Sequence, residues 1–518
     1  MKINPLRLAQ IYLKKILLSF ENDGKNSKYF NEEYCTTFAC TLFDRKFYKE
    51  QYLKDCDKDI DLVEHYIKQG WRLGYSPSLK FNNDAYLYIH QDLIKSNVSP
   101  IYNFIQNKGK QSYFRINFDP VKDAATIYPV LPQKKVKSEL KLGDKESSKV
   151  KNKNILIVSH ELSNTGAPMV MVELVVALKE LGYNVVVLCP EDGPIRGKLE
   201  KINVLVIVDK HFFMKLMLQR PKLLDFINQF SIVWFNTLAY AHYAQYIPNE
   251  LKTMCWIHEA NRFLDDPPYD LEVLRKIDVL LSVSNYVLKS LQNHIDIKSE
   301  VLYYGLDFNK FKGEPSLKAI DNNKITFLSV GTYYFRKGMD ILVSYIDSLP
   351  QELKTQCRFV IVGKNGDTVE FDKEQLERNP ELEILGELSH EETLQQILNC
   401  DVLVCLSRDD PLPTVITEAT IYGKAVMCSE NVGQYSLIED QDTGFKVSSK
   451  EDFISSVEYI LNHKAELPKI SEKFKDQYLP LVDYKNFKEN VSKLLEKSYG
   501  IDKLLDTEKH LVNGRCVN

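Results

Sequence analysis

The chain has 518 residues with 67 basic and 71 acidic side chains, which gives a formal net charge of -4. This length suits about three domains of ~150 residues, and the balanced charge excludes a protein that binds nucleic acid through overall positive charge. None of the 10 cysteines is in a CxxC motif, and several lie in apolar segments. We therefore expect reduced thiols in a cytoplasmic protein, without a zinc site.

The N-terminal segment 1–20 is apolar but interrupted by Lys2, Arg7, Lys14 and Lys15. A signal peptide or a membrane span needs a longer uninterrupted apolar stretch. We therefore expect neither, although a basic, apolar segment of this kind can also lie on a membrane surface.

Segments 43–67 and 81–105 resemble each other with a shift of 38 residues. The apolar positions within each segment have helical spacing, and units of this length commonly stack to share a core. The matching pairs are Phe43 and Phe81, Tyr48 and Tyr86, Val63 and Ile101, Tyr66 and Phe104, and Ile67 and Ile105. We predict a helical repeat module over residues 1–118. Recruiting a partner protein, extending a binding surface of the chain and self-association are all open roles for it.

The stretch from Lys134 to Asn154 contains eight lysines and three acidic residues and almost no bulky apolar side chains. Such a composition buries too little surface to fold, so we predict a linker over residues 119–153. Alternatively, the lysines of this stretch bind an anionic membrane surface.

Beyond the linker, short apolar segments alternate with amphipathic helical ones. Strands that are apolar on both faces and separated by helices are typical of parallel sheets covered on both sides. The fold class is therefore α/β, with two doubly wound, Rossmann-like domains facing a cleft, after the all-α module. A break near 307–323 divides these domains into residues 154–322 and 323–485, followed by a C-terminal helix and tail, 486–518. The expected strands are 154–158, 184–188, 204–208, 231–235, 279–283, 325–330, 358–362, 382–385, 401–404 and 425–427.

In doubly wound folds the ligand lies at the carboxyl ends of the strands. The first strand is followed by a loop with Gly166, after which we expect a helix that has Pro168 at its first position and ends at Gly182. The glycine would let backbone approach a ligand, although a strand–helix connection often needs a glycine in any case.

In the second domain, the first strand ends in Gly331, and Arg336 and Lys337 follow. Two adjacent cations at such an edge suit a diphosphate, because each charge-assisted hydrogen bond contributes roughly 1.5–3 kcal/mol. A solvated Arg-Lys pair is the alternative interpretation. The next strand ends in a tight turn at Gly363, and Ser389 with Glu392 predicts a capping box at the start of a helix.

Two carboxylates follow the strand at 401–404, in a loop that leads into another helix. Asp410 lies in the loop, and Glu418 is expected in the first turn of the helix. Carboxylates accept hydrogen bonds from vicinal hydroxyls, and the amides of Thr414 and Val415 lie at a helix start, where they bind polar or anionic groups. The polar groups of this loop are therefore suited to bind the hydroxyl groups of a sugar and of a ribose.

The ordered series of these motifs resembles glycosyltransferase family 4 over roughly residues 154–480. The donor-binding half of that family is similar to Gly331 through Gly338, Phe359 through Gly363 and Asp410 through Gly433; its acceptor half is similar to Asn164 through Pro168 and Trp256 through Glu259. The resemblance implies a GT-B fold and metal-independent, retaining transfer from a nucleotide sugar, without a further cofactor.

The resemblance also implies residue roles. Glu418 would hold the donor ribose, Asp410 the transferred sugar, and Arg336 and Lys337 the diphosphate, while His258 would line the acceptor side. The donor site would further include Gly331, Gly363, Gly386, Thr414 and Val415, and the acceptor side Asn164, Gly166, Ala167 and Glu259. Without the resemblance, His258 is better explained as a core histidine that ends a strand.

The chain departs from the family pattern at three positions. Asp410 stands where the family usually has glutamate, Thr332 where it has arginine, and Pro413 where many members have glycine. Arg336 is expected to replace the missing cation, and Pro413 removes one amide donor.

Two alternative functions stay open. The chain can be a nucleotide-sugar epimerase, or a non-catalytic glycan-binding or scaffold protein. Asp57 and Asp59 match an Asp-x-Asp metal motif, but they lie in the helical module and are expected to be solvated. Segment 211–220, basic and apolar, is either a membrane-surface helix or a domain-packing helix. A membrane-bound acceptor would agree with surface polysaccharide synthesis at the inner face of a membrane.

Overall fold

The computed structural model describes residues 32–38, 40, 42–54, 60–79, 81–107, 128–131, 153–311, 324–364, 366 and 377–499. The segment 1–20, the Asp57 motif, most of the 119–153 linker, the centre of the 307–323 break and the tail beyond 499 lie outside these residues. The chain forms two compact units. The first contains residues 1–133, 208–230 and 246–248, and the second contains the rest of the chain.

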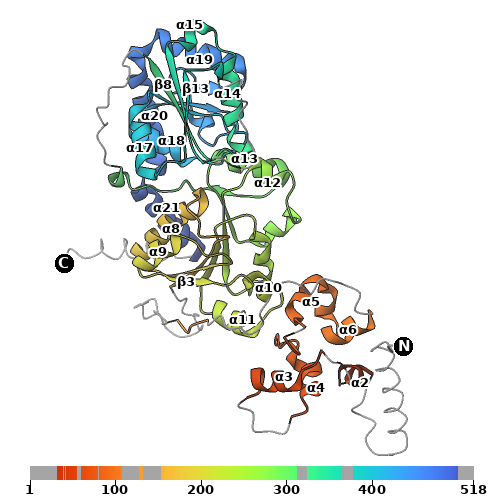
Figure 1. Cartoon of the computed structure of the whole chain (residues 1–518). Coiled ribbons are helices and arrows are strands. Elements are labelled where there is room, and N and C mark those ends of the chain that lie inside the picture. Colours follow the sequence, from red (N-terminus) through yellow and green to blue (C-terminus); the bar gives the residue numbers. More distant parts are fainter. Residues whose placement is uncertain are drawn as a thin grey trace, which may run out of the picture. The chain divides into compact units, whose positions relative to one another are not determined.

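The first unit is helical in its described part (Figure 1). Its helices are α2 (Glu32–Phe38), α3 (Arg45–Tyr52), α4 (Leu62–His65), a π-helical turn (Tyr66–Gly70), α5 (Asn83–Ile89), α6 (Pro100–Gln106), α10 (Phe212–Met217) and α11 (Pro221–Ile227). The structure thus includes in this unit a segment, 208–230, that the sequence placed in the first α/β domain.

Matching aromatic residues of segments 43–67 and 81–105 make matching contacts. The rings of Phe43 and Tyr66 lie 5.4 Å apart in an edge arrangement, as do those of Phe81 and Phe104. The Tyr48 hydroxyl hydrogen-bonds the residue 17 positions later, and so does that of Tyr86. The two segments thus make equivalent contacts, and their assembly into a repeat module stays a prediction.

The helix α10 resolves the two interpretations of segment 211–220. Its apolar side chains Phe212, Phe213, Leu216 and Met217 are all buried. Arg220, just beyond the helix, is also buried and pairs with Asp84 of α5. The structure therefore agrees with the packing-helix interpretation of this segment, because its apolar side chains are already covered by protein.

The first sheet of the second unit has seven strands in the order β3-β2-β1-β4-β5-β6-β7, and the pairings from β2 to β7 are parallel. The strands are β1 (Asn154–Val158), β2 (Asn184–Cys189), β3 (Leu205–Val208), β4 (Ile232–Phe235), β5 (Lys252–Ile257), β6 (Val279–Ser282) and β7 (Glu300–Val301). All five residues of β1 are buried, since helices cover both faces of the sheet.

The second sheet has six parallel strands in the order β10-β9-β8-β11-β12-β13. They are β8 (Ile325–Val330), β9 (Cys357–Val362), β10 (Leu382–Gly386), β11 (Val402–Cys405), β12 (Ala425–Ser429) and β13 (Phe445–Val447). Two parallel sheets with flanking helices confirm the predicted pair of Rossmann-like domains. We call them the first and second sheet domains.

The helices that follow the strands depart from the predictions at two positions, the first of which is the start of α8. The helix α8 covers Gly166–Glu180, and Thr165 precedes it without a side-chain capping hydrogen bond. Pro168 is therefore its third residue and not its first. Proline is tolerated there because the first N–H groups of a helix have no partner within the helix. The predicted capping box at Ser389 and Glu392 is confirmed, at the start of α17 (His390–Asn399).

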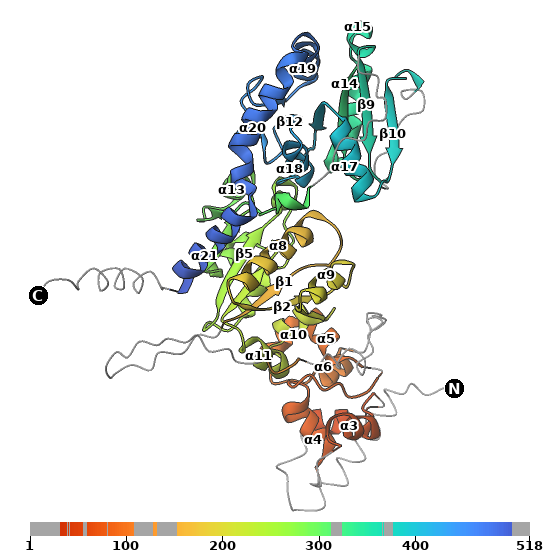
Figure 2. The ribbon, with the colours of Figure 1, turned by 90° about the vertical axis from the view of Figure 1, so that its left-hand side faces the viewer.

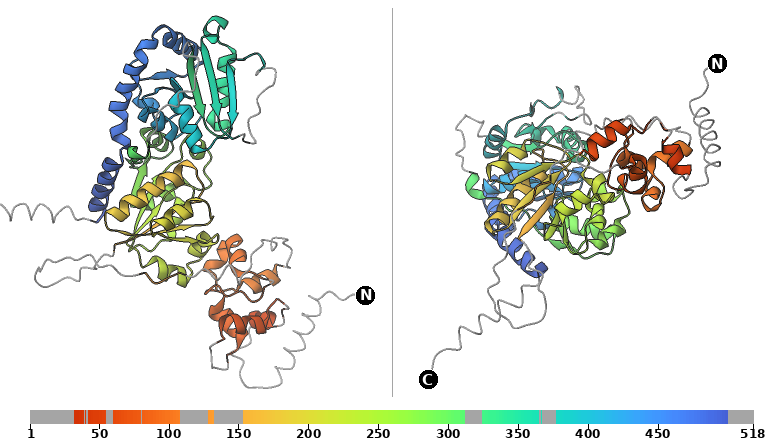
Figure 3. Two further views of the ribbon diagram at one scale, coloured as in Figure 1. Left: turned by 60° about the vertical axis from the view of Figure 1, so that its left-hand side comes forward. Right: turned by 90° about the horizontal axis from the view of Figure 1, so that it is seen from below.

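The C-terminal helices cross back to the first sheet domain. Figure 2 and Figure 3 show α20 (Leu467–Val482) running along the second sheet domain into α21 (Tyr484–Tyr499), which lies beside α8. Phe487 of α21 stacks on Trp256 of β5 with a centroid distance of 5.8 Å. At the crossing, the Leu306 N–H donates to Val482 O (2.8 Å) and the Tyr484 N–H donates to Leu306 O (3.1 Å).

Candidate active site

A cleft of about 800 Å³ lies at the carboxyl ends of the strands of both sheet domains. It brings together eleven of the predicted site residues: Gly166, Ala167, His258, Glu259, Gly331, Arg336, Lys337, Asp410, Thr414, Val415 and Glu418. Asn164, Gly363 and Gly386 do not line it. Asn164 is exposed, and Gly363 packs so closely on Gly331 that an added Cβ would collide with the Gly331 carbonyl.

The two predicted cations lie in a short 3-10 turn, Phe335–Lys337, just after β8. Gly338 ends this turn with φ 65°, a conformation that favours glycine. A Cβ at Gly338 would also collide with the Leu406 carbonyl after β11. Glycine thus lets the turn approach the loop that carries the aspartates.

Asp410 lies between these cations. Its Oδ2 is 2.6 Å from Lys337 Nζ, and its Oδ1 is 3.9 Å from Arg336 Nη1. Asp410 is only 6% exposed, and its backbone is fixed by hydrogen bonds with Asn431 and Gly433. The hydrogen-bonded loop therefore holds a carboxylate that pairs with Lys337.

Glu418 is the fifth residue of α18 (Thr414–Ile421), at the start of its second turn and not in the first turn as predicted. Within the described part of the chain, its carboxylate has no hydrogen-bond partner. Burial raises its pKa to about 7. An unpartnered carboxylate in a cleft is suited to accept hydrogen bonds from ligand hydroxyls, which would replace its lost hydration.

His258 follows β5 on the opposite wall. Its ring packs against Trp256 at 4.6 Å, and its Nε2 is 3.3 Å from Asn236 Oδ1. Burial, with a smaller contribution from His160, lowers the pKa of His258 to about 3. The imidazole is therefore neutral at physiological pH, and it can exchange hydrogen bonds with a ligand but cannot supply a positive charge.

Glu259 is held by donors of its own domain. Its carboxylate accepts hydrogen bonds from Thr237 Oγ1 (2.5 Å) and from the N–H groups of Leu238 (2.9 Å) and His258 (3.0 Å). With these three donors, Glu259 shapes the loop after β5 and so fixes the backbone of His258.

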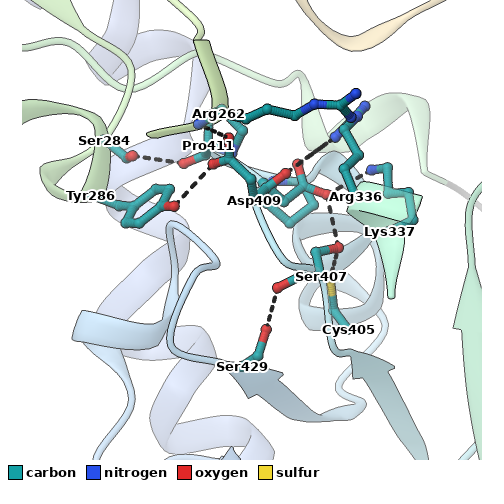
Figure 4. A network of polar contacts seen from close by, with 12 residues as sticks. Arg262, Ser284, Tyr286, Arg336, Lys337, Cys405, Ser407, Asp409, Pro411 and Ser429 are labelled. Carbon is teal, nitrogen blue, oxygen red and sulfur yellow. Dashed lines mark hydrogen bonds and ion pairs between the residues drawn. The ribbon is translucent and has the colours of Figure 1, made fainter. Parts of the chain in front are cut away.

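Sequence reasoning missed a polar network that joins the two sheet domains (Figure 4). The Asp409 carboxylate accepts hydrogen bonds from the Arg262 N–H (2.9 Å) and the Tyr286 hydroxyl (2.9 Å). Beside it, the Ser284 hydroxyl donates to Pro411 O (2.6 Å). The partners are more than 120 residues apart in the chain, so no local pattern signals the contacts.

His160 also lines the cleft and was not singled out from the sequence.

The described residues contain no group of three or more His, Cys, Asp or Glu side chains that could hold a metal ion. Where the structure describes cysteine side chains, all are free thiols, and every one except Cys40 is buried. No described helix is long and apolar enough to span a membrane.

Two family models match the two sheet domains. The model described as "Glycosyl-transferase family 4" matches residues 151–301, and that described as "Glycosyl transferases group 1" matches residues 314–477. Together they cover both walls of the cleft.

Relatives and solved structures agree with this assignment. An uncharacterized glycosyltransferase of Methanocaldococcus jannaschii is 25% identical over 182 residues, 33% of this chain and 46% of the relative. A phosphatidylinositol N-acetylglucosaminyltransferase subunit of Schizosaccharomyces pombe is 22% identical over 200 residues, 38% of this chain and 43% of the relative. The chain thus spans less than half the length of these curated relatives.

Among solved structures, Anabaena HepE in complex with UDP matches with a TM-score of 0.56 and 17% identity, over 66% of this chain and 100% of HepE. The lipopolysaccharide outer core galactosyltransferase WaaB matches with a TM-score of 0.51 and 16% identity, over 66% of this chain and 99% of WaaB. At these identities the similarity shows the fold, which is GT-B. With its two matched domains, the chain belongs to glycosyltransferase family 4.

Proposed function

We propose that the protein transfers a sugar from a nucleotide-sugar donor to a glycan or lipid-linked acceptor, with retention of configuration. The observation that carries this proposal is the placement of Arg336 and Lys337 in the same cleft as Asp410 and Glu418. The two cations suit a diphosphate, and the two carboxylates suit the hydroxyls of a sugar and a ribose.

The transfer breaks the bond between the anomeric carbon and its phosphate oxygen. Positive charge develops on the sugar ring and negative charge on the departing diphosphate, which Arg336 and Lys337 stabilise. Removing one such fixed group typically lowers a rate by about 10²–10³. Because these side chains supply the countercharge, we propose transfer without a metal ion.

The acceptor hydroxyl forms the new bond to the anomeric carbon on the face that the phosphate leaves. Its proton passes to the departing phosphate oxygen, so no protein nucleophile takes part. Neutral His258 is placed to hydrogen-bond a substrate hydroxyl, and the loop at Gly166 lets the acceptor approach the backbone.

A UDP-sugar is the donor to test first, since HepE was solved with UDP and with UDP-glucose.

A glycan in surface polysaccharide synthesis is the acceptor class that we propose. The names of WaaB and of the S. pombe relative both point to lipid-bearing acceptors. A membrane acceptor would require a surface other than segment 211–220. Flotation with liposomes tests this, and equal recovery with neutral and anionic lipid would count against membrane binding.

The function is tested by nucleoside diphosphate release from a panel of nucleotide sugars. The variants are Glu418→Ala and Lys337→Ala, with Arg275→Ala as control, because Arg275 pairs with Glu272 outside the cleft. Release from one donor that only the first two variants abolish supports the proposal. No release from any donor, with no nucleotide binding by calorimetry, rejects it and favours a scaffold.

A further inference from the structure

Arg262 differs from the other arginines that the structure describes in the two sheet domains. Arg196, Arg275, Arg336, Arg358, Arg378 and Arg408 each form an ion pair with an aspartate or a glutamate. Arg262 has no carboxylate within 4.0 Å in the described part of the chain, not even Asp266, which lines the same cleft. An arginine side chain without a carboxylate partner, exposed in a cleft, is available to bind an anion.

The backbone of Arg262 is nevertheless fixed. Its N–H donates to Asp409 Oδ2, and Asp409 is held in turn by the Tyr286 hydroxyl. Arg262 belongs to the short helix α12 (Asn261–Leu264) of the first sheet domain, whereas Asp409 belongs to the second. The bond therefore ties Arg262 to the loop that contains Asp410.

The side chain extends into the cleft. In Figure 4 it runs from the Asp409 contact toward the guanidinium of Arg336, and both residues line the cleft. The other cations of the cleft, Arg336 and Lys337, face Asp410, so their charge is partly neutralised. Among the arginines and lysines that the structure describes in this cleft, Arg262 alone has no carboxylate partner, so a ligand phosphate can bind it without displacing one.

We propose that Arg262 is a phosphate-binding residue of the cleft, contributed by the domain opposite the Arg336–Lys337 turn. This inference rests on the proposed function. The diphosphate of the donor is the favoured source of the phosphate, because Asp409 fixes Arg262 next to Asp410. A phosphate carried by the acceptor is the other source of the same chemistry.

Calorimetry with UDP, GDP and ADP tests the proposal on the full-length protein. With the nucleotide that binds best, Arg262→Ala is expected to weaken binding about 10- to 100-fold, as one charge-assisted bond implies. The matching nucleoside, which lacks the phosphates, should bind native protein and variant equally. Arg262→Lys should bind with intermediate affinity, because it keeps the charge but not the planar fork. Arg275→Ala is the matched control and should leave binding unchanged.

A second experiment distinguishes the diphosphate of the donor from a phosphate carried by the acceptor. Inorganic phosphate is titrated into the protein saturated with the nucleoside diphosphate. If Arg262→Ala leaves nucleotide binding intact but removes phosphate binding, Arg262 serves an acceptor phosphate. If both are unchanged, the proposal is overturned. If native protein binds no nucleoside diphosphate, the proposed function itself fails, and this inference fails with it.

Discussion

Lys337 Nζ lies 2.6 Å from Asp410 Oδ2, so the residue proposed to bind the diphosphate is paired with a carboxylate before any donor arrives. A donor must therefore compete with Asp410 for Lys337. The carboxylate of Asp410 compensates the charge of Lys337, which would otherwise be costly to hold partly buried in the cleft.

This competition predicts opposite effects for the two partners. Asp410→Asn should strengthen UDP binding by about threefold to tenfold, because a negative charge next to the diphosphate is removed. It should also lower transfer, because the sugar loses an acceptor for its hydroxyls. Lys337→Ala should weaken UDP binding at least about tenfold. Calorimetry and donor turnover measure these effects; weaker UDP binding in Asp410→Asn would contradict the competition.

Donor binding should depend on pH through Glu418. The pKa of Glu418 is raised to about 7, so in the free protein the carboxylate ionises between pH 6 and 8. The ionised form accepts hydrogen bonds from ribose hydroxyls, and we expect affinity to increase by about tenfold over this range. UDP-glucose is the suitable probe, since its diphosphate does not titrate near pH 7. Glu418→Gln should remove this part of the pH dependence. If the affinity of the variant for UDP-glucose increases with pH as steeply as that of the native protein, the role of Glu418 is contradicted.

His258 should make the protein sensitive to acid. Its folded-state pKa of about 3 lies below the ordinary histidine value of 6.5, so the unfolded state binds more protons between these values. The free energy of unfolding should therefore fall as pH decreases through this window, by about 2 kcal/mol from this residue at pH 5. Urea unfolding of native protein and His258→Gln at pH 7.5 and pH 5 measures this. The variant should lose less stability on acidification; an equal loss would show that His258 is not responsible.

The close approach of Gly305 to Phe487 gives a prediction about stability. A Cβ at Gly305 would lie 2.5 Å from the Cβ of Phe487, so Gly305→Ala must displace the start of α21. We expect a loss of about 1–3 kcal/mol in the free energy of unfolding. Gly197→Ala in α9 (Ile195–Lys201) is the control, because its Cβ would meet nothing within 4 Å. It should be neutral or slightly stabilising.

The sheets were predictable because strands buried on both faces are continuously apolar. The predicted segments 154–158 and 325–330 coincide with β1 and β8. The predicted segments omit three strands, β5, β7 and β13. The two-residue β7 and the three-residue β13 are too short to show a pattern. The six-residue β5 is long enough, and its apolar run was used only as the strand that ends at His258. The start of α8 was also misplaced, because Pro168 marks the first turn of a helix but not a particular position in it.

The site was predictable where its residues follow strands, as Arg336, Lys337 and His258 do. The partners of Asp409 were not, because Arg262 and Tyr286 approach it only through the packing of two domains. Segment 211–220 shows the same limit. The sequence pattern of a basic, apolar helix is the same whether protein or lipid covers it. The tertiary contacts, such as the pairing of Arg220 with Asp84, are needed to distinguish the two cases.

The chain passes between the sheet domains twice, once after β7 and once from α20 to α21, and the two passages are hydrogen-bonded to each other at Leu306. Tied in this way, they act as a single pivot. A motion that separates the two halves of the cleft would have to disrupt both crossings at this point, so we expect any opening to be a rotation about Leu306. Opening would release the bonds of Asp409 to Arg262 and Tyr286, and closing would remake the same ones.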